Sequence, residues 1–185
     1  MNDLEKNGMQ AGKPFDYNIV LIGFMGTGKS TVSACLSAMF GMETVEMDHV
    51  IAAREAMSIQ DIFANYGEEY FRDLETELLI GLKSRKNTVI SCGGGAVLRT
   101  RNVAEMKKNG KVVLLTASPE TVYSRVKDSD DRPVLRDRKN VTDISELMEQ
   151  RRERYEAAAD IVIDTDNKTV QAVCEELVQR LMEMR

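Results

Sequence analysis

The stretch GFMGTGKS, residues 23–30, decides the fold. It follows the apolar run NIVLIG (18–23) and precedes the helical pattern KSTVSACLSAMF (29–40). Its form, G-x-x-x-x-G-K-S between a strand and a helix, is that of a loop whose backbone N–H groups and helix dipole hold phosphate. The glycines allow the tight turn that points these N–H groups toward phosphate oxygens. The sequence therefore predicts a phosphate-binding loop at the end of its first strand.

A nucleoside triphosphate with Mg²⁺ is the expected ligand of this loop. Lys29 is placed to reach the β- and γ-phosphates, and the Ser30 hydroxyl is a candidate Mg²⁺ ligand. A Gly-rich turn without a ligand is the alternative, but the flanking strand and helix favour the phosphate site. The candidate ATP-binding residues of the loop are Gly26, Thr27, Gly28, Lys29, Ser30 and Thr31.

Two places in the chain offer a second carboxylate for the metal. Asp164 ends the run IVID as a Walker-B aspartate would, whereas Glu46 and Asp48 follow the second apolar run. We favour the second run, because two acids there can divide between metal and substrate. We expect Asp164 to begin a turn instead, a common use of aspartate.

The composition places limits on partners. The net charge of −5 argues against a general binder of nucleic acid or of anionic membranes. The chain has no run of 18 apolar residues, so no membrane span is predicted. The three cysteines show no CxxC spacing, and this odd count suits reduced thiols in a cytoplasmic protein.

Apolar runs alternate with helical patterns along the chain. Two of these patterns are SIQDIFANY (58–66), which opens with the helix-cap signal Ser58 and Asp61, and EEYFRDLETELLIGLKSR (68–85). Such alternation implies right-handed crossovers and hence a parallel sheet with helices on both faces, an α/β fold of three layers. Ligands of such sheets bind at the carboxyl ends of the strands. The five expected strands are 18–23, 43–47, 88–92, 111–117 and 160–165.

Candidate acceptor-site residues follow several of these runs. They are an aspartate, a glycine triplet and arginines, a set that suits a polyhydroxylated carboxylic acid. Residues 127–140 are rich in charge and lack periodicity, which is typical of a mobile lid or of a surface loop. The candidates are Asp48, Arg72, Gly93, Gly94, Gly95, Arg132 in the charged segment, and Arg151.

Three of these candidates also have a plain structural interpretation. Asp48 could cap a helix, and Arg72 could be a solvated residue paired with Glu68 or Glu69. Arg151 could belong to a charged outer face, since two further arginines follow within three residues. Spacing alone does not decide between these interpretations.

Three functional classes compete for a chain with this loop. A GTPase switch is excluded because no aspartate has glycine three positions on and no NKxD stretch occurs. A non-catalytic ATP-binding module needs no acceptor site, whereas a small-molecule kinase needs a base, orienting groups and a cation.

The motifs in order resemble those of the shikimate kinase family, from about residue 17 to 183. The resemblance rests on GFMGTGKST, on Asp48, and on GEEYFR (67–72) and GGGA (93–96). It continues with Arg132-Pro133, with Arg151 followed by Tyr155, and with AADIVIDT (158–165).

The resemblance implies ATP-dependent phosphorylation of the shikimate 3-hydroxyl, in the pathway to the aromatic amino acids. It implies that Asp48 accepts or orients the hydroxyl, that Arg72 and Arg151 hold the carboxylate and that Arg132 reaches the phosphates. It also places Arg125 and, more weakly, Lys168 beside adenine, gives Gly93, Gly94 and Gly95 as the lining of the substrate pocket, and implies a monomer. A gluconate-type kinase is the alternative enzyme.

Two departures from the family pattern stand out. Glu46 occupies the position of a usual aspartate, where it would hold Mg²⁺ through a water, and RRERY lacks a frequent proline. For domain organisation we expect a disordered leader over 1–16 and one kinase domain over 17–185. Within that domain we expect a substrate-binding region near 46–75 and a lid near 127–140.

Overall fold

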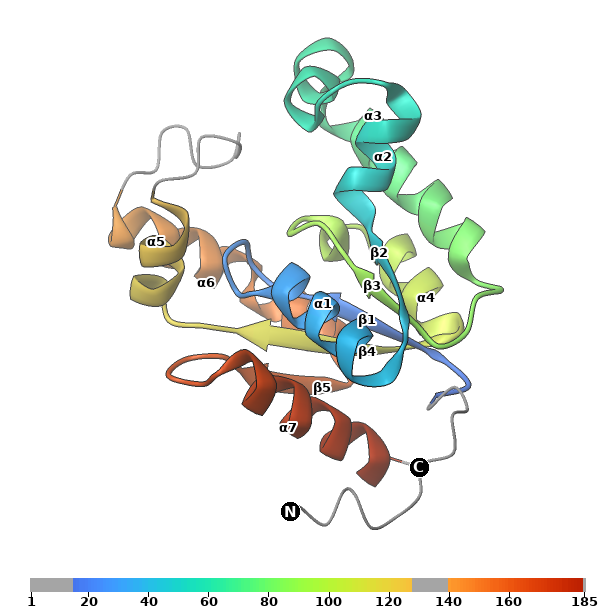
Figure 1. The fold of residues 1–185 in the computed structure, drawn as a ribbon. Helices are drawn as coiled ribbons and strands as arrows, with labels where there is room; N and C mark the ends of the chain where they lie inside the picture. Colours follow the sequence, from blue (N-terminus) through green and yellow to red (C-terminus); the bar gives the residue numbers. More distant parts are fainter. Residues whose placement is uncertain (1–14, 128–139, 185) are drawn as a thin grey trace.

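The computed structural model describes residues 15–127 and 140–184, and in them a five-stranded parallel sheet is flanked by helices (Figure 1). The strand order is β2-β3-β1-β4-β5, so the strand that leads into the phosphate loop is central. This confirms the predicted fold class, and each expected strand is present to within one residue at either end. The bounds are β1 Asn18–Ile22, β2 Glu43–Glu46, β3 Thr88–Ser91, β4 Gly110–Thr116 and β5 Ile161–Asp164.

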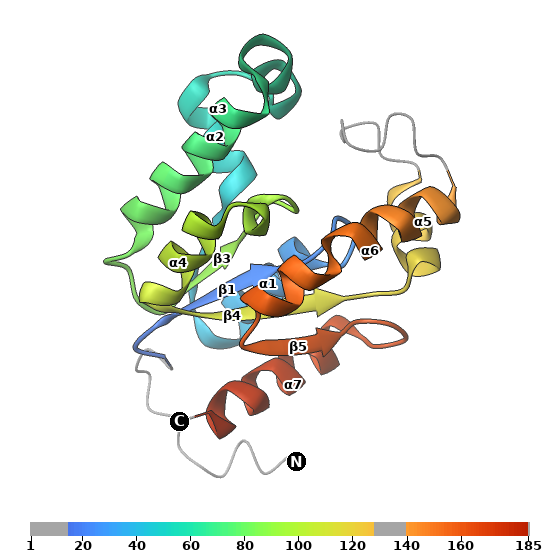
Figure 2. The same ribbon diagram turned by 180° about the vertical axis from the view of Figure 1, so that it is seen from behind.

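Helices cover both faces of the sheet. α1 and α7 lie on one face, and α3, α4 and α6 lie on the other (Figures 1 and 2). The helices are α1 Lys29–Phe40, α2 Met47–Glu55, α3 Ile59–Leu82, α4 Thr100–Lys108, α5 Pro119–Val126, α6 Val141–Ala158 and α7 Val170–Glu183, with a 3₁₀ turn, η2, at Ala96–Leu98.

The central strand shows why the sheet needs both layers. All five residues of β1 are buried. Ile19 and Leu21 pack into the core under α1 and α7, while Val20 and Ile22 pack into the core under α3 and α4. Successive side chains of a strand point to opposite faces, so a strand covered on both faces is apolar throughout.

A small lobe rises above the carboxyl edge of the sheet. It is built by α2 and the first part of α3 (Figure 1). α3 begins at a Ser58 cap, whose side chain accepts a hydrogen bond from the Asp61 N–H, as the sequence pattern indicated. Two helices were expected in this region, and they run together with one non-helical residue, Gly67, between them.

Candidate active site

The phosphate loop has the backbone geometry that its glycines predict. Gly26 and Gly28 have φ of 79° and 95°, in the left-handed region that residues with a side chain rarely adopt. α1 then starts at Lys29, with Gly28 as its N-cap and without a side-chain cap. The first N–H groups of α1 therefore keep the capacity to bind an anion.

Lys29 lies folded over the loop. Its Nζ donates to the carbonyl oxygens of Gly23 and Phe24, at 2.9 and 3.0 Å. The ammonium group therefore lies beside the loop whose N–H groups would hold the phosphates.

A hydroxyl and a carboxylate meet beside the loop, where a metal would accompany the phosphates. Ser30 Oγ donates to Glu46 Oε2 at 2.8 Å, and both side chains are at least partly accessible. Oxygen ligands of this kind suit Mg²⁺, which uses few protein ligands and keeps several waters. The described residues contain no cluster of three or more His, Cys, Asp or Glu side chains able to hold a metal. Ser30 and Glu46 therefore fit a metal that is bound mainly by phosphate oxygens and water.

The glycine triplet after β3 lies against the candidate substrate side chains. A Cβ added to Gly93 would lie 2.7 Å from Asp48 Oδ1 and 3.0 Å from Glu75 Oε1. A Cβ added to Gly95 would lie 2.1 Å from a terminal nitrogen of Arg72. Real Cβ atoms essentially never lie under 3.0 Å from another heavy atom, so Asp48 and Arg72 can come this close only because residues 93 and 95 are glycine.

Asp48 lies in the first turn of α2 and is exposed. The residue that caps α2 is Glu46, so the interpretation of Asp48 as an ordinary N-cap does not hold. Asp48 is instead an accessible carboxylate beside Gly93 at the carboxyl edge of the sheet.

Arg72 is held inside the molecule by two glutamates. It is 7% exposed, and its guanidinium donates to Glu75 Oε2 at 2.7 Å and to Glu68 Oε1 at 2.9 Å. The pairing with Glu68 was foreseen, but the interpretation of Arg72 as a solvated surface residue is wrong. A buried guanidinium fixed by two carboxylates is oriented before any ligand arrives.

Glu75 was missed by the sequence analysis. It is completely buried, and its Oε1 has no hydrogen-bond partner among the described residues. Burial raises the pKa of Glu75 to about 7, while the nearby Arg72 opposes this shift and Asp48 adds to it. Its place three residues after Arg72, one helical turn along, was the signal in the sequence that could have revealed it.

α6 closes the site from the other side of the glycine loop. The Tyr155 hydroxyl donates to the Gly94 carbonyl oxygen. Burial raises the pKa of Tyr155 to about 12, and the charge and hydrogen bond of Arg151 oppose the shift. Arg72 lowers the same pKa more weakly, so Arg151 and Arg72 both act on the Tyr155 hydroxyl. Tyr155 was noted only as part of a motif, and the structure makes it the link between α6 and the glycine loop.

Arg125 lies beside the phosphate loop. Its guanidinium donates to the Gly26 carbonyl oxygen at 3.0 Å and to Thr165 Oγ1 at 3.3 Å. It therefore bridges the loop to the segment after β5. Asp164 begins a turn there, as expected, by accepting from the Asp166 N–H.

The other residues predicted to bind ATP differ in their accessibility and in their contacts. Thr31 is exposed in the first turn of α1, but Thr27 is buried and its hydroxyl donates to the Phe24 carbonyl oxygen. Lys168 forms an ion pair with Glu176 of α7 at 2.6 Å. Arg132 and most of the predicted lid lie outside the described residues.

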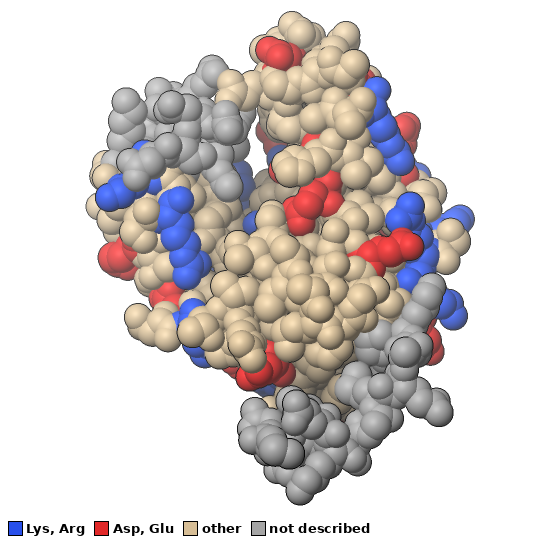
Figure 3. All heavy atoms as spheres, viewed as in Figure 1, with Lys and Arg blue, Asp and Glu red and all other residues tan. Residues whose placement is uncertain are grey.

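Asp48, Arg72, Arg151 and the glycine triplet, though far apart along the chain, thus gather at one edge of the sheet. Figure 3 shows a hollow in the surface below the lobe of α2 and α3, on the side of the molecule that carries the phosphate loop.

Comparison with known proteins identifies the family of the chain. The family described as "Shikimate kinase" matches residues 25–182. Shikimate kinase of Persephonella marina is 43% identical over 164 residues, which cover 89% of this chain and 98% of that protein. The crystallised shikimate kinase from Acinetobacter baumannii, in complex with shikimate, is 31% identical with a TM-score of 0.86, covering 91% of this chain and 94% of that one.

A gluconokinase from Sinorhizobium meliloti shares the fold at 17% identity and a TM-score of 0.58, over 92% of this chain and 94% of that one. This likeness concerns the fold alone, whereas the two shikimate kinases are 43% and 31% identical in sequence over a similar share of the chain. The chain belongs to the shikimate kinase family.

Proposed function

We propose that this protein transfers the γ-phosphoryl group of ATP to the 3-hydroxyl of shikimate, giving shikimate 3-phosphate and ADP. The observation that carries the proposal is the convergence of Asp48 and Arg72 on the glycine loop of a family member, beside the phosphate loop. Asp48 matches the acceptor hydroxyl, Arg72 matches the substrate carboxylate, and the phosphate loop matches the triphosphate.

The substrate would be oriented by its carboxylate. Arg72 presents a planar fork of donors that matches a carboxylate, and Arg151 adds a second cation from α6. The Glu68 and Glu75 carboxylates hold the Arg72 guanidinium in place. Glycines at 93 and 95 let Asp48 and Arg72 lie against the backbone that would line the substrate pocket.

Phosphoryl transfer would follow from that orientation. The 3-hydroxyl attacks the γ-phosphorus as the bond to the β–γ bridging oxygen breaks, and Asp48 accepts the hydroxyl proton. Lys29 turns from its carbonyl partners to the phosphates, and the N–H groups of the loop and of α1 hold the phosphate oxygens. Arg132 would add a cation from the predicted lid.

ATP would bind together with Mg²⁺, held by Ser30 and, through a water, by Glu46. Bound metal neutralises charge on the β- and γ-phosphates. In titrations of the kinase rate with Mg²⁺, Glu46→Gln should need more metal for half-maximal activity than the wild-type protein. An unchanged titration would place the second carboxylate elsewhere.

The protein would work as a monomer in the cytoplasm, with small molecules as its partners. One chain supplies all the groups assigned to the site, and its three cysteines are unpaired thiols, which suits a reducing compartment. No helix in 15–127 and 140–184 has the length and apolar character needed to span a bilayer. Light scattering at micromolar concentration should give the mass of one chain.

The decisive assay couples ADP formation to shikimate, gluconate and a nucleoside monophosphate in separate reactions. We expect ADP formation with shikimate alone, and a product phosphorylated at the 3-hydroxyl by NMR. Turnover with gluconate instead would identify another sugar-acid kinase. ATP binding without transfer to any acceptor would identify a non-catalytic nucleotide-binding module.

A further inference from the structure

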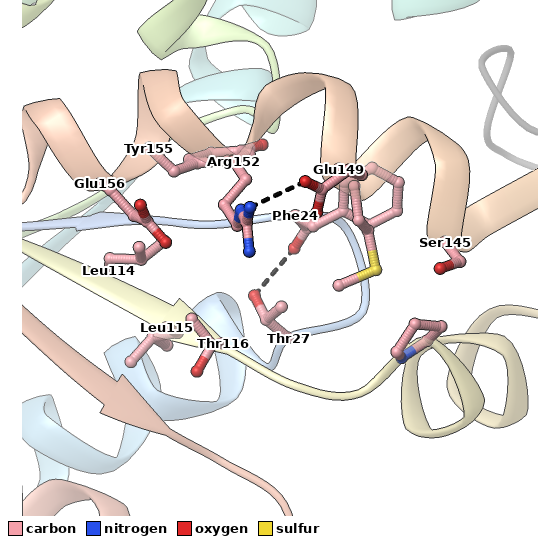
Figure 4. Close-up of a pocket in the computed structure, with 12 residues that line it drawn as sticks. Phe24, Thr27, Leu114, Leu115, Thr116, Ser145, Glu149, Arg152, Tyr155 and Glu156 are labelled. Carbon is pink, nitrogen blue, oxygen red and sulfur yellow. Dashed lines mark hydrogen bonds and ion pairs between the residues drawn. The ribbon is translucent and has the colours of Figure 1, made fainter.

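A separate cavity lies between α6 and β4, on the face of the sheet opposite α1. Its volume is about 260 Å³, and Figure 4 shows the side chains of α6 above it and β4 below it. Among residues 15–127 and 140–184, its walls include none of the residues assigned to shikimate and, of those assigned to ATP, only Thr27. The described walls of the cavity therefore differ from those of the candidate active site, which it adjoins.

The walls of this cavity combine an apolar interior with a charged rim. Phe24, Leu114, Pro119 and Met148 are among the residues that form the apolar part. A cavity of about 150 Å³ lined by apolar side chains holds benzene. The larger volume here accommodates a ring of that size with a short polar chain, and falls below the roughly 300–1,000 Å³ of pockets for larger ligands.

The rim carries charges of both signs. Arg152 lies between Glu149 and Glu156, and pairs with Glu149 at 2.8 Å (Figure 4). The side chains of this pair are 60% and 64% exposed, and an exposed ion pair contributes little to stability. A ligand carboxylate can therefore replace Glu149 at the Arg152 guanidinium at small cost. Because two carboxylates face one guanidinium, the rim favours a ligand that also carries a positive group.

We propose that this cavity is a second ligand site that binds a zwitterionic amino acid with an aromatic side chain. The ring lies against Phe24 and Met148, the ligand carboxylate binds Arg152, and the ligand ammonium group lies beside Glu156. No covalent step is involved. This binding does not depend on the function proposed above.

The walls of the cavity also adjoin both halves of the active site. The Phe24 carbonyl oxygen accepts from Lys29 Nζ, and Thr27 donates to the same oxygen at 2.8 Å. Tyr155, another wall residue, donates to Gly94 in the glycine loop. An occupied cavity therefore alters the apparent affinity for ATP or shikimate, and these substrates alter the affinity of the amino acid by the same factor.

Calorimetry and ligand-observed NMR with L-phenylalanine test the site. We expect saturable binding in the millimolar range or tighter, which persists in the presence of saturating shikimate and ATP analogue. Phenylacetate, phenethylamine and L-alanine each lack one of the three recognised groups. The affinity for each should be lower than that for L-phenylalanine by at least about tenfold, as expected for loss of one charge-assisted bond or of the ring contact.

Three variants of α6 locate the binding. Arg152→Ala should weaken binding of L-phenylalanine roughly tenfold, and Ser145→Phe, which fills the cavity from its exposed edge, should abolish it. Arg154→Ala is the matched control, because Arg154 is exposed on the same helix and is not a wall residue. All three should keep the kinase activity measured without amino acid, which shows that they fold.

The proposal has clear contrary outcomes. It is wrong if L-phenylalanine shows no saturable binding, if it binds no better than its three relatives, or if Ser145→Phe binds it normally. Displacement by shikimate or ATP in direct competition would place the amino acid in the active site instead. A KM for ATP and for shikimate that L-phenylalanine leaves unchanged would overturn the coupling.

Discussion

Asp48 and Glu75 are carboxyl groups that face the same glycine, yet their surroundings differ. A Cβ on Gly93 would approach both, but Asp48 is exposed and Glu75 is completely buried. An accessible carboxylate can meet a substrate hydroxyl, whereas a buried one paired with Arg72 acts by holding that guanidinium. The difference in burial therefore gives Asp48 a role in contacting the substrate and Glu75 a role in positioning Arg72.

Asp48→Asn should separate binding from chemistry. The amide keeps the size of the side chain but cannot accept the hydroxyl proton, so kcat should fall about 10²–10⁴-fold. The affinity for ATP, measured by calorimetry, should change little because Asp48 lies on the acceptor side of the site. Turnover close to that of the wild-type protein would remove Asp48 from the mechanism.

Glu75→Gln should change how stability depends on pH. The pKa of Glu75 is about 7 in the folded protein, against 4.5 for an ordinary glutamate. Between pH 4.5 and pH 7 the folded protein therefore binds a proton at Glu75 more strongly than the unfolded protein does. This contribution is present below about pH 4.5 and is lost as the pH rises through 7. It amounts to a few kcal/mol, since a tenfold change in proton affinity corresponds to about 1.4 kcal/mol.

Urea denaturation of the wild-type protein and of Glu75→Gln checks this. The free energy of unfolding of the wild type should fall relative to that of the variant between about pH 5 and about pH 8. Glu77→Gln, an exposed site on the same helix, should show no such trend. A difference between wild type and Glu75→Gln that is constant with pH would show that Glu75 does not titrate in this range.

Among the elements, the loop between β3 and η2 joins the groups of the substrate side. Asp48 of α2, Arg72 of α3 and Tyr155 of α6 all reach it. The loop has no side chains of its own at 93–95, so three helices can approach its backbone. Its role is therefore geometric.

Gly95→Ala should disturb the substrate side selectively. The added methyl would lie 2.1 Å from an Arg72 nitrogen, so the guanidinium must move and the shikimate KM should rise roughly tenfold or more. Gly81→Ala is the matched control, because Gly81 lies in the last turn of α3 and a Cβ there meets nothing within 4 Å. It should stabilise the protein by about 0.5–1 kcal/mol and leave kinetics unchanged. Equal KM values in the two variants would contradict the contact.

The regular elements were largely predictable from local patterns. Continuous apolar runs marked the buried strands, and the Ser58 and Gly-Lys-Ser signals marked where α3 and α1 begin. The short helix α2 was considered only as an alternative, because Met47–Glu55 lacks a clear apolar stripe and is set by tertiary packing. The merging of two expected helices into α3 depends on the backbone at Gly67, which sequence periodicity does not specify.

At the scale of the whole molecule, the parallel sheet turns distant residues into neighbours. Because all strands point the same way, β1, β2 and β3 end at one edge of the sheet, and the segments that follow them begin there. This rule selected Asp48 and the glycine triplet from sequence. It could not select Glu75 or Tyr155, since both lie inside helices, and their roles depend on which face of α3 and α6 points inward.

The same limit applies to the arginines of α6. Arg151, Arg152 and Arg154 have equal charge and nearly equal position in sequence. Only the packing of α6 through Tyr155 separates Arg151, which acts on the glycine-loop contact, from Arg152, which lines the cavity below the helix. Rotation of a helix is a tertiary property, and it assigns two adjacent arginines to two different sites.

The central claim is that Arg72 of α3 and Arg151 of α6 bind one shikimate molecule. Calorimetric titration of shikimate and, separately, of an ATP analogue into Arg72→Lys, Arg151→Ala and the control Arg154→Ala tests it most directly. Arg72→Lys keeps the charge beside Glu75 but loses the planar fork of donors. The account predicts that shikimate affinity falls roughly tenfold or more in the first two proteins only, with affinity for the analogue retained in all three. Unchanged shikimate affinity in the first two, or a loss confined to the ATP analogue, would contradict it.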